Sequence, residues 1–307
     1  MRSLRTLAVV LLVPVLAACG ASPAPSQAAP APSQAAPAPA AVVTPTADPC
    51  PQWGCEQQSR FTAASTFIAA KKGHLGIVVR DRVTGAVWRG GEPDFRIWAG
   101  SVPKLAFALS LKQDEAVGKL SLDADADRDI DGMLSVSDNN AADQLWGWFA
   151  RPSAQMTRWR DIYGMSTASY VDGFPNAWGF VKCSAQDLAN LMSYILDKAD
   201  PQLRSFLVDR MRTVGRPQQW GVWGAGAGLH PGVKDGWSVE ADDNGNGHWI
   251  TATVGFVGPN ERYVVGAMYD QPTGGDTIEA GVHTLTDLVA TVFGAPVPAP
   301  AVIPEDY

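Results

Sequence analysis

The spacing of apolar residues predicts strands near both ends of the chain and a helical middle. From 248 to 258 apolar and polar side chains alternate, which is the period of a strand with one buried face. Residues 262–269 repeat this alternation, and the turn residues at 260–261 predict that the two strands pair as a hairpin.

A helix is predicted after these strands and another near the start of the domain. Residues 276–293 carry apolar side chains every three or four positions, and residues 59–72 have a helical composition. Strands are predicted at 75–80 and 86–89, joined by a Thr-Gly turn. Between these terminal segments the pattern predicts helices at 101–117, 127–137, 139–149, 153–163, 184–199 and 201–213.

This order predicts an α+β fold rather than a parallel α/β sheet, because strands and helices do not alternate along the chain. We expect an antiparallel sheet flanked by the N- and C-terminal helices, with an inserted helical subdomain. The domain spans residues 59–294. A cleft between the sheet and the helical insertion is the expected position of a binding site.

The N-terminal sequence predicts that the protein is exported across the cell membrane. Arg2 and Arg5 precede an apolar stretch that ends in Leu-Ala-Ala-Cys19, the pattern of a lipoprotein signal peptide over residues 1–18. Cys19 is then the lipidated residue, and its palmitate-type chains anchor the protein to the bacterial cell membrane. The alternative is an ordinary signal peptide with a chance cysteine. No other apolar run approaches the roughly 20 residues of a membrane helix.

Residues 19–58 consist mainly of Ala, Pro, Ser and Gln, and they predict an extended spacer between the membrane and the domain. Residues 295–307 are again rich in Pro, Ala and Val, and are expected to form a flexible tail.

Charge narrows the range of partners. The chain has 24 Lys and Arg against 31 Asp and Glu, a formal net charge of -7. Because phosphate binding needs a concentrated basic surface, this balance argues against a nucleic-acid partner. The expected partners are the membrane, through the N-terminal lipid, and peptidoglycan peptide.

Three cysteines remain after Cys19. Cys50 and Cys55 lie close in sequence in an oxidising compartment, so we expect a disulfide at the entrance to the domain. Cys183 is then a free, buried thiol. No second Cys pair or His pair accompanies them, so neither a metal nor another cofactor is expected.

Ser101 and Lys104 are the first candidates for chemistry. They stand three residues apart at the start of a predicted helix, so they share one face and the Lys104 amine can reach the Ser101 hydroxyl as its base. Backbone N–H groups at a helix start also favour an oxyanion. The structural alternative is that Ser101 caps the helix.

Two further polar stretches carry candidate residues. Ser137 and Asn139 lie between two predicted helices, where a hydroxyl can relay a proton and an amide can bind substrate; a polar helix junction is the simpler interpretation. Lys234 precedes Asp235, Gly236 and Trp237 on a predicted strand. A lysine there can bind a substrate carboxylate, the glycine lets substrate approach the strand, and the Trp237 N–H can donate to an oxyanion.

In this order, S-x-x-K, S-D-N and K-x-G resemble the motifs of the penicillin-recognising serine acyltransferases, the class A β-lactamases and D,D-peptidases. The contexts WAGSVPKLAFALSL and SDNNAAD are similar to those of LppW-type alanine-rich lipoproteins. The resemblance implies roles for the candidates: Ser101 nucleophile, Lys104 base, Ser137 proton relay, Asn139 ligand of substrate and lysine, Lys234 carboxylate binder, and the N–H groups of Ser101 and Trp237 an oxyanion hole.

Two departures from the family pattern bear on activity. Asp235 replaces a hydroxyl residue, and a carboxylate facing the substrate is expected to repel a carboxylate-bearing ligand. Residues 169–184, which correspond to the family's Ω loop, contain no Glu to prime a deacylating water. We therefore expect weak or no β-lactamase activity. The rival hypothesis is an inactive descendant that binds peptidoglycan or an envelope partner.

Two other interpretations of the sequence are weaker. Asp127, Asp129, Asp131 and Asp138 imitate the spacing of a calcium loop, but they overlap a predicted helix and the Ser137 motif. The four histidines are scattered and there is no G-x-S-x-G sequence, which argues against a Ser-His-Asp hydrolase.

Overall fold

A computed structural model describes residues 50, 52–241, 247–274 and 277–305. The chain divides into two units, residues 1–46 and 47–307, and all the described residues belong to the second. The predicted signal peptide, the lipidation site at Cys19 and most of the predicted linker lie outside the described residues. None of the helices that are described is long and apolar enough to cross a membrane.

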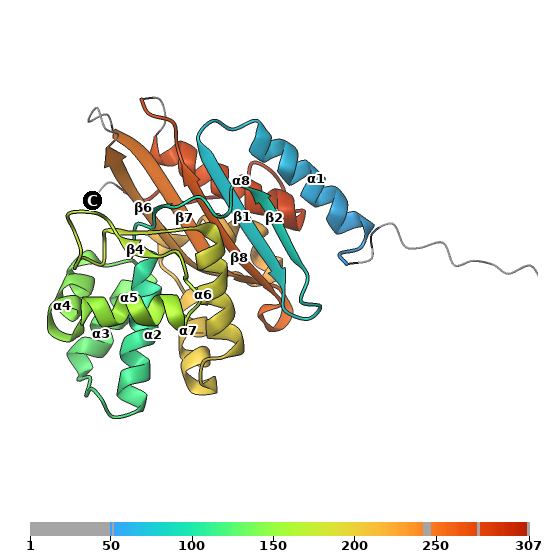
Figure 1. Cartoon of the computed structure of the whole chain (residues 1–307). Coiled ribbons are helices and arrows are strands. Elements are labelled where there is room, and N and C mark those ends of the chain that lie inside the picture. The colour runs from blue at the N-terminus through green and yellow to red at the C-terminus, as the bar shows by residue number, and fades with distance from the viewer. Residues whose placement is uncertain (1–49, 51, 242–246, 275–276, 306–307) are drawn as a thin grey trace, which may run out of the picture. The chain divides into compact units, whose positions relative to one another are not determined.

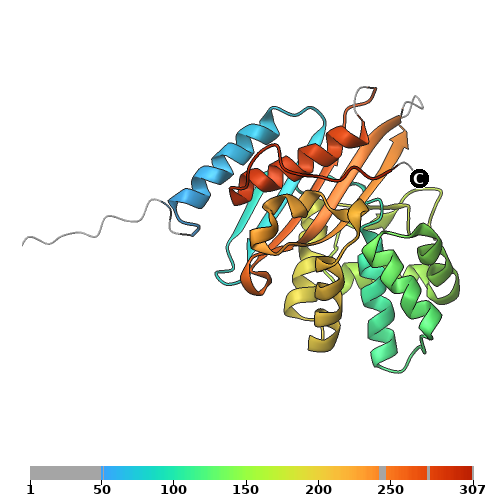
Figure 2. The ribbon, with the colours of Figure 1, turned by 180° about the vertical axis from the view of Figure 1, so that it is seen from behind.

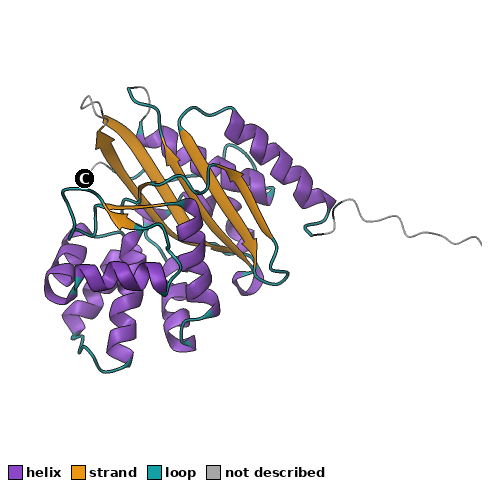
Figure 3. Cartoon of the chain, viewed as in Figure 1, coloured by secondary structure: helices purple, strands orange, loops and turns teal. Residues whose placement is uncertain are grey.

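The centre of the second unit is a five-stranded antiparallel sheet with the strand order β2-β1-β8-β7-β6 (Figure 3). Its strands are β1 (His74–Asp81), β2 (Val87–Gly91), β6 (Gly232–Ala241), β7 (Gly247–Val257) and β8 (Tyr263–Asp270). Gly85 takes a positive φ of 77° in the turn between β1 and β2. The predicted hairpin of β7 and β8 is confirmed, and a short 3₁₀ turn, η4 (Pro259–Glu261), joins its strands.

The two terminal helices, α1 (Cys55–Ala69) and α8 (Ile278–Phe293), cover one face of the sheet and lie side by side (Figure 2). The apolar face of α8 packs on the sheet, as its helical spacing predicted. This core layer includes Val282, Leu285 and Val289 of α8 together with Val265 and Ala267 of β8, all fully buried.

The opposite face of the sheet carries the helical lobe (Figure 1). It consists of α2 (Pro103–Ala116), α3 (Ala124–Ser135), α4 (Asn139–Phe149), α5 (Pro152–Asp161), α6 (Ala185–Asp197) and α7 (Pro201–Arg212). Helix α2 is buried along most of its length, and its apolar side chains join those of Ile250, Val254 and Phe256 in a second core layer. The predicted α+β fold with an inserted helical subdomain is therefore confirmed.

Several short elements escape the sequence pattern because they are too short to show a period. A small sheet of order β3-β5-β4 contains β3 (Ile97–Trp98), β5 (Val181–Cys183) and β4 (Ser169–Tyr170). Three 3₁₀ turns, η1 (Arg216–Gln218), η2 (Gly221–Ala225) and η3 (Ala227–Leu229), connect α7 to β6. They carry the chain from the helical lobe back to the edge strand.

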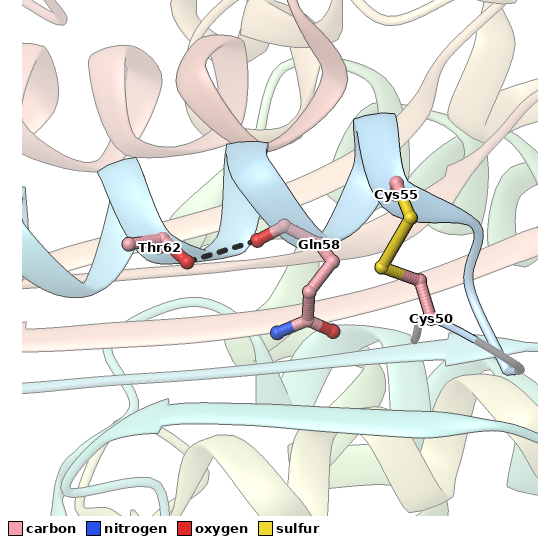
Figure 4. Close-up of a disulfide and its surroundings, with 4 residues drawn as sticks. All are labelled: Cys50, Cys55, Gln58 and Thr62. Carbon is pink, nitrogen blue, oxygen red and sulfur yellow. Dashed lines mark hydrogen bonds between the residues drawn. A yellow bond between two sulfur atoms is a disulfide. The ribbon is translucent and has the colours of Figure 1, made fainter. Parts of the chain in front are cut away.

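A disulfide joins Cys50 to Cys55, whose Cα atoms lie 5.1 Å apart (Figure 4). Cys55 is also the first residue of α1, so the ordered domain begins before residue 59 and the predicted linker boundary at 58 is too late. The next turns of α1 are polar on the outside, where Thr62 donates to the carbonyl of Gln58 at 3.1 Å. Cys183 is a free, buried thiol, as predicted.

The predicted flexible tail is wrong for residues up to 304. Ala299 is buried and its N–H donates to Asp287 of α8 at 2.7 Å. The Val302 N–H donates to the carbonyl of Gln219 at 3.1 Å. A composition rich in Pro and Ala lowers the chain entropy lost on docking, so such a segment can pack without forming a helix or strand.

Candidate functional site

The three sequence motifs meet at the junction of the sheet and the helical lobe. Ser101 lies just before α2, Ser137 and Asn139 lie at the junction of α3 and α4, and Lys234 lies on the edge strand β6. A cavity of about 260 Å³ opens between them. Its lining residues are Ser101, Ser137, Asn139, Trp237, Ser238, Val239 and Trp249.

Ser137 is the common contact of both lysines. Its hydroxyl oxygen lies 3.2 Å from Lys104 Nζ and 3.0 Å from Lys234 Nζ. Its backbone has a φ of +64°, a left-handed conformation that costs a non-glycine residue on the order of 1–3 kcal/mol. The Ser137 carbonyl oxygen accepts from Lys104 Nζ at 2.5 Å, so the strained backbone helps to position the amine.

Lys104 is fully buried, and its amine also donates to Asn139 Oδ1 at 2.6 Å. Burial lowers the pKa of Lys104 from 10.5 to about 7, although the nearby Asp138 and Asp143 carboxylates favour the ammonium and raise it. An amine with a pKa near neutrality is divided between its charged and neutral forms, so Lys104 can accept a proton under physiological conditions.

Ser101 lines the cavity and is partly exposed. Among the described residues, no hydrogen bond joins the Ser101 hydroxyl to the Lys104 amine, in contrast to the expected pairing. The reason is local: Ser137 and Asn139 take the donors of that amine. Ser101 and Lys104 nevertheless belong to one helical turn, because the Lys104 N–H donates to the Ser101 carbonyl at 3.2 Å.

Lys234 is also fully buried, and its amine donates to three protein acceptors. These are Ser137 Oγ at 3.0 Å, Gln218 Oε1 at 2.9 Å and the Asp235 carbonyl at 2.7 Å. Burial lowers the pKa of Lys234 well below its ordinary value; the Lys104 ammonium adds to this shift, and Asp235 opposes it. Each N–H of a Lys234 ammonium therefore has an acceptor within the protein, and its role as a carboxylate binder stays a prediction.

Asp235 does not face the cavity, and the expected repulsion of substrate by this residue is wrong. Asp235 is the cross-strand partner of Thr253, so the two side chains lie on the same face of the sheet. Thr253 Oγ1 accepts from the Val222 N–H of η2 at 3.0 Å, which places this face away from the site. Burial raises the pKa of the fully buried Asp235 carboxyl well above 3.8, which favours the uncharged acid.

Gly236 lets the edge strand approach the start of α2. A Cβ at Gly236 would lie 2.4 Å from the Ala99 carbonyl oxygen and 2.6 Å from the Ser101 nitrogen. Gly100, with a φ of +53°, is equally tight, since its Cβ would lie 2.5 Å from the Trp237 nitrogen. The two glycines therefore allow the N–H groups of Ser101 and Trp237 to lie close together, as an oxyanion hole requires.

Two residues at the site were missed by sequence reasoning. Gln218 is fully buried, and its Oε1 accepts from Lys234 Nζ and from the Asp235 N–H at 2.8 Å. Trp178 lies in residues 169–184, the segment that corresponds to the Ω loop, in which only carboxylate residues were considered as candidates. Its ring covers Lys104, with the amine 4.5 Å from the ring centroid, and its Nε1 donates to Asp143 Oδ1 at 2.7 Å.

An ion pair between distant elements lies next in sequence to the cavity lining. Lys182 of β5 and Glu240 of β6 are 2.6 Å apart, with side chains 34% and 16% exposed. Glu240 follows Val239, which lines the cavity, so the pair stands at that end of the site. This contact joins the small sheet to the edge of the main sheet.

The alternative calcium loop is excluded by secondary structure. Asp127, Asp129 and Asp131 lie on helix α3 and contact Lys112, Gln144 and Arg210, respectively. Asp138 caps α4 instead. In the part of the chain that the structure describes, no three His, Cys, Asp or Glu side chains gather as metal ligands do.

The same fold occurs in solved structures of known class. A β-lactamase from Burkholderia vietnamiensis matches at a TM-score of 0.62 and 18% identity, over 77% of this chain and 96% of that one. The structure of PBP-A matches at a TM-score of 0.59 and 17% identity, over 77% of this chain and 95% of that one. A search against family models gave no match. The chain therefore has the fold of the β-lactamases and penicillin-binding proteins.

Sequence comparison then narrows the class. The lipoproteins named LppW of Mycobacterium tuberculosis and Mycobacterium bovis are each 31% identical to this chain over 259 residues. The match covers 81% of this chain and 78% of each relative. The chain belongs to the LppW lipoprotein family, as its motif contexts predicted.

Proposed function

We propose that the protein is a membrane-anchored envelope lipoprotein whose Ser101 forms an acyl-enzyme with an ester or amide, and that it has weak or no true β-lactamase activity. One observation carries the proposal: the buried Lys104 amine, with a pKa of about 7, lies beside a cavity lined by both Ser101 and Ser137. Burial of an amine costs folding free energy, and groups with strongly shifted pKa values gather at catalytic sites, where a base is needed near neutral pH.

The groups at the site can carry out acyl transfer as follows. Ser101 Oγ attacks the carbonyl carbon while its proton passes to the neutral Lys104 amine, and the N–H groups of Ser101 and Trp237 hold the resulting oxyanion. The oxyanion then collapses and the bond to the leaving group breaks. Ser137, which contacts Lys104 Nζ, passes the proton to the leaving oxygen or nitrogen.

Slow turnover of the acyl-enzyme is expected for two reasons. Residues 169–184 contain no Glu that could act as a general base, and Asp172 is the one carboxylate in this stretch. In addition, the Trp178 ring covers the Lys104 amine. A water that attacks the acyl-enzyme from this side therefore lacks the glutamate base, and the tryptophan occupies space beside the amine. Fast hydrolysis of β-lactams needs both the base and the space.

The test is covalent labelling of the full-length protein in detergent. After incubation with a fluorescent penicillin and, separately, with p-nitrophenyl acetate, intact mass and peptide mapping should show an adduct on Ser101 with at least one probe. The adduct should disappear in Ser101→Ala and remain in Ser238→Ala, a second serine of the cavity lining. No adduct with either probe would contradict the proposal.

The absence of a Ser101–Lys104 hydrogen bond in the described site favours a second candidate, an inactive cleft that binds peptidoglycan or an envelope partner. For this candidate, neither probe labels the protein, yet it sediments with purified cell-wall sacculi. Substitution of Asn139 by Ala should then weaken sedimentation, since Asn139 belongs to the cavity lining.

Membrane anchoring through Cys19 remains part of the proposal, because the residue lies outside the described structure. Cys19→Ser should move the protein from the membrane fraction to the soluble fraction of fractionated cells. Retention of this variant in the membrane would contradict the lipid anchor and support an uncleaved signal segment instead.

A further inference from the structure

The chemistry of the cavity lining bears on which substrate fits. All seven lining residues are uncharged, since the set consists of three serines, one asparagine, two tryptophans and one valine. A site that selects an anionic substrate places at least one cation where the anion can reach it. The described lining offers no such group.

The two lysines behind the lining do not supply this cation. Both are fully buried. The three donors of a Lys234 ammonium match three protein acceptors, and the Lys104 amine contacts Ser137 and Asn139 while Trp178 covers it. A substrate carboxylate would have to displace these short contacts in a desolvated place, and the new ion pair would not offset that loss.

The ion pair near the Val239 end of the cavity offers no free cation either. Lys182 is the cation next to the Val239 end of the cavity, and Glu240 neutralises it at 2.6 Å. The exposed fractions of the two side chains, 34% and 16%, leave the pair only partly open to water. Charge at this described part of the rim is therefore balanced.

Trp237, Val239 and Trp249 complete the lining without adding a charge. Trp237 and Val239 follow Asp235 by two and four residues on β6, and Val239 is the cross-strand partner of Trp249, so these three side chains share the Asp235 face of the sheet. Both indoles pack against the core layer that includes α8. No cation therefore enters the site from these positions.

We propose that the cleft accepts an uncharged ester or amide, with no carboxylate close to the scissile bond. This inference rests on the proposed function, since it specifies the substrate of the same Ser101 site. Ser101 Oγ bonds to the substrate carbonyl carbon, the bond from that carbon to the leaving oxygen or nitrogen breaks, and the proton of Ser101 ends on the leaving group.

The experiment compares two aryl esters that differ in one charge. Full-length protein is mixed with the m-carboxyphenyl and the m-carbamoylphenyl esters of N-phenylacetylglycine, and the rate of Ser101 acylation is followed by intact mass. Each rate is divided by the rate of hydrolysis of that ester in hydroxide, which removes the difference in intrinsic reactivity. We expect the uncharged ester to acylate Ser101 at least tenfold faster.

A charge variant tests the cause. Glu240→Gln releases Lys182 from its partner, so it should raise the relative rate of the carboxylate ester several-fold. Glu279→Gln, on the exposed start of α8, is the matched control and should leave the ratio of rates unchanged.

The outcomes separate the two proposals. Equal rates, or faster acylation by the carboxylate ester, would overturn the uncharged-substrate inference and leave the acyl-enzyme intact. An absence of label from both esters, together with an unlabelled Ser101 in the penicillin and p-nitrophenyl acetate experiment, would overturn the proposed function and this inference with it.

Discussion

The rate of Ser101 acylation should follow the titration of the Lys104 amine. Burial lowers the pKa of Lys104 from 10.5 to about 7. At pH 7 about half of the amine is then neutral, against roughly 0.03% of an unperturbed lysine, a gain of about a thousandfold in available base. Because the protonated amine cannot act as a base, acylation should fall about tenfold per pH unit below pH 6 and level off above about pH 8.

Asp143→Asn tests the electrostatic part of this argument. The Asp143 carboxylate favours the Lys104 ammonium, so its removal should lower the pKa of Lys104 and move the acid limb to lower pH by up to about one unit. Asparagine keeps an oxygen that can accept from Trp178 Nε1. Asp125→Asn, which alters an exposed carboxylate paired with Arg128, is the control and should not move the limb.

The assay is a single-turnover measurement of acylation by an uncharged aryl ester between about pH 5 and pH 10, with Ser101→Ala as the background. A half-maximal rate near pH 10 would refute the effect of burial. A rate independent of pH would refute Lys104 as the base. A shift of the acid limb to higher pH in Asp143→Asn would refute the sign of the charge interaction.

Three further predictions concern the frame of the site. Gly236→Ala should reduce acylation about a hundredfold or more in the same assay, because the new Cβ collides with the backbone at Ser101 and opens the oxyanion hole. Asp235 has a pKa well above 3.8 in the folded protein, so folding takes up a proton and stability falls as pH rises above about 4. Asp235→Asn removes this loss, so the free energy of urea unfolding of the variant, relative to that of the wild type, should rise from about pH 4 to pH 7. A difference between the two free energies that does not change with pH would mean that the carboxyl is ionised. Asp187→Ala should lower the free energy of urea unfolding by about 3 kcal/mol, because the buried Asp187 carboxylate accepts from the N–H of Ser184, the residue that caps α6. A decrease of less than about 1 kcal/mol would contradict that role.

The fold could be predicted from the sequence where burial imposes a period over many residues. The alternation in β7 and the helical spacing of α8 both survive in the structure, because each element has one face on the core. The two-residue strand β3 has no period to detect. The segment after Phe293 is held by single hydrogen bonds and by the buried Ala299. Such isolated contacts leave no periodic pattern in the sequence.

The positions of the site residues could be predicted from motif order, but the directions of their side chains could not. Lys234 and Asp235 are neighbours in sequence, yet strand geometry sends one toward Ser137 and the other toward Thr253. Gln218 and Trp178 belong to no motif. Their roles depend on which buried donor or amine lies opposite, and this information exists only in three dimensions.

The Lys182–Glu240 contact also makes the attachment of the small sheet to strand β6 depend on salt. The two side chains are 34% and 16% exposed, so ions in solution reach the pair. Salt weakens such a pair. Rising ionic strength should therefore loosen the hold of β5 on the edge of the main sheet.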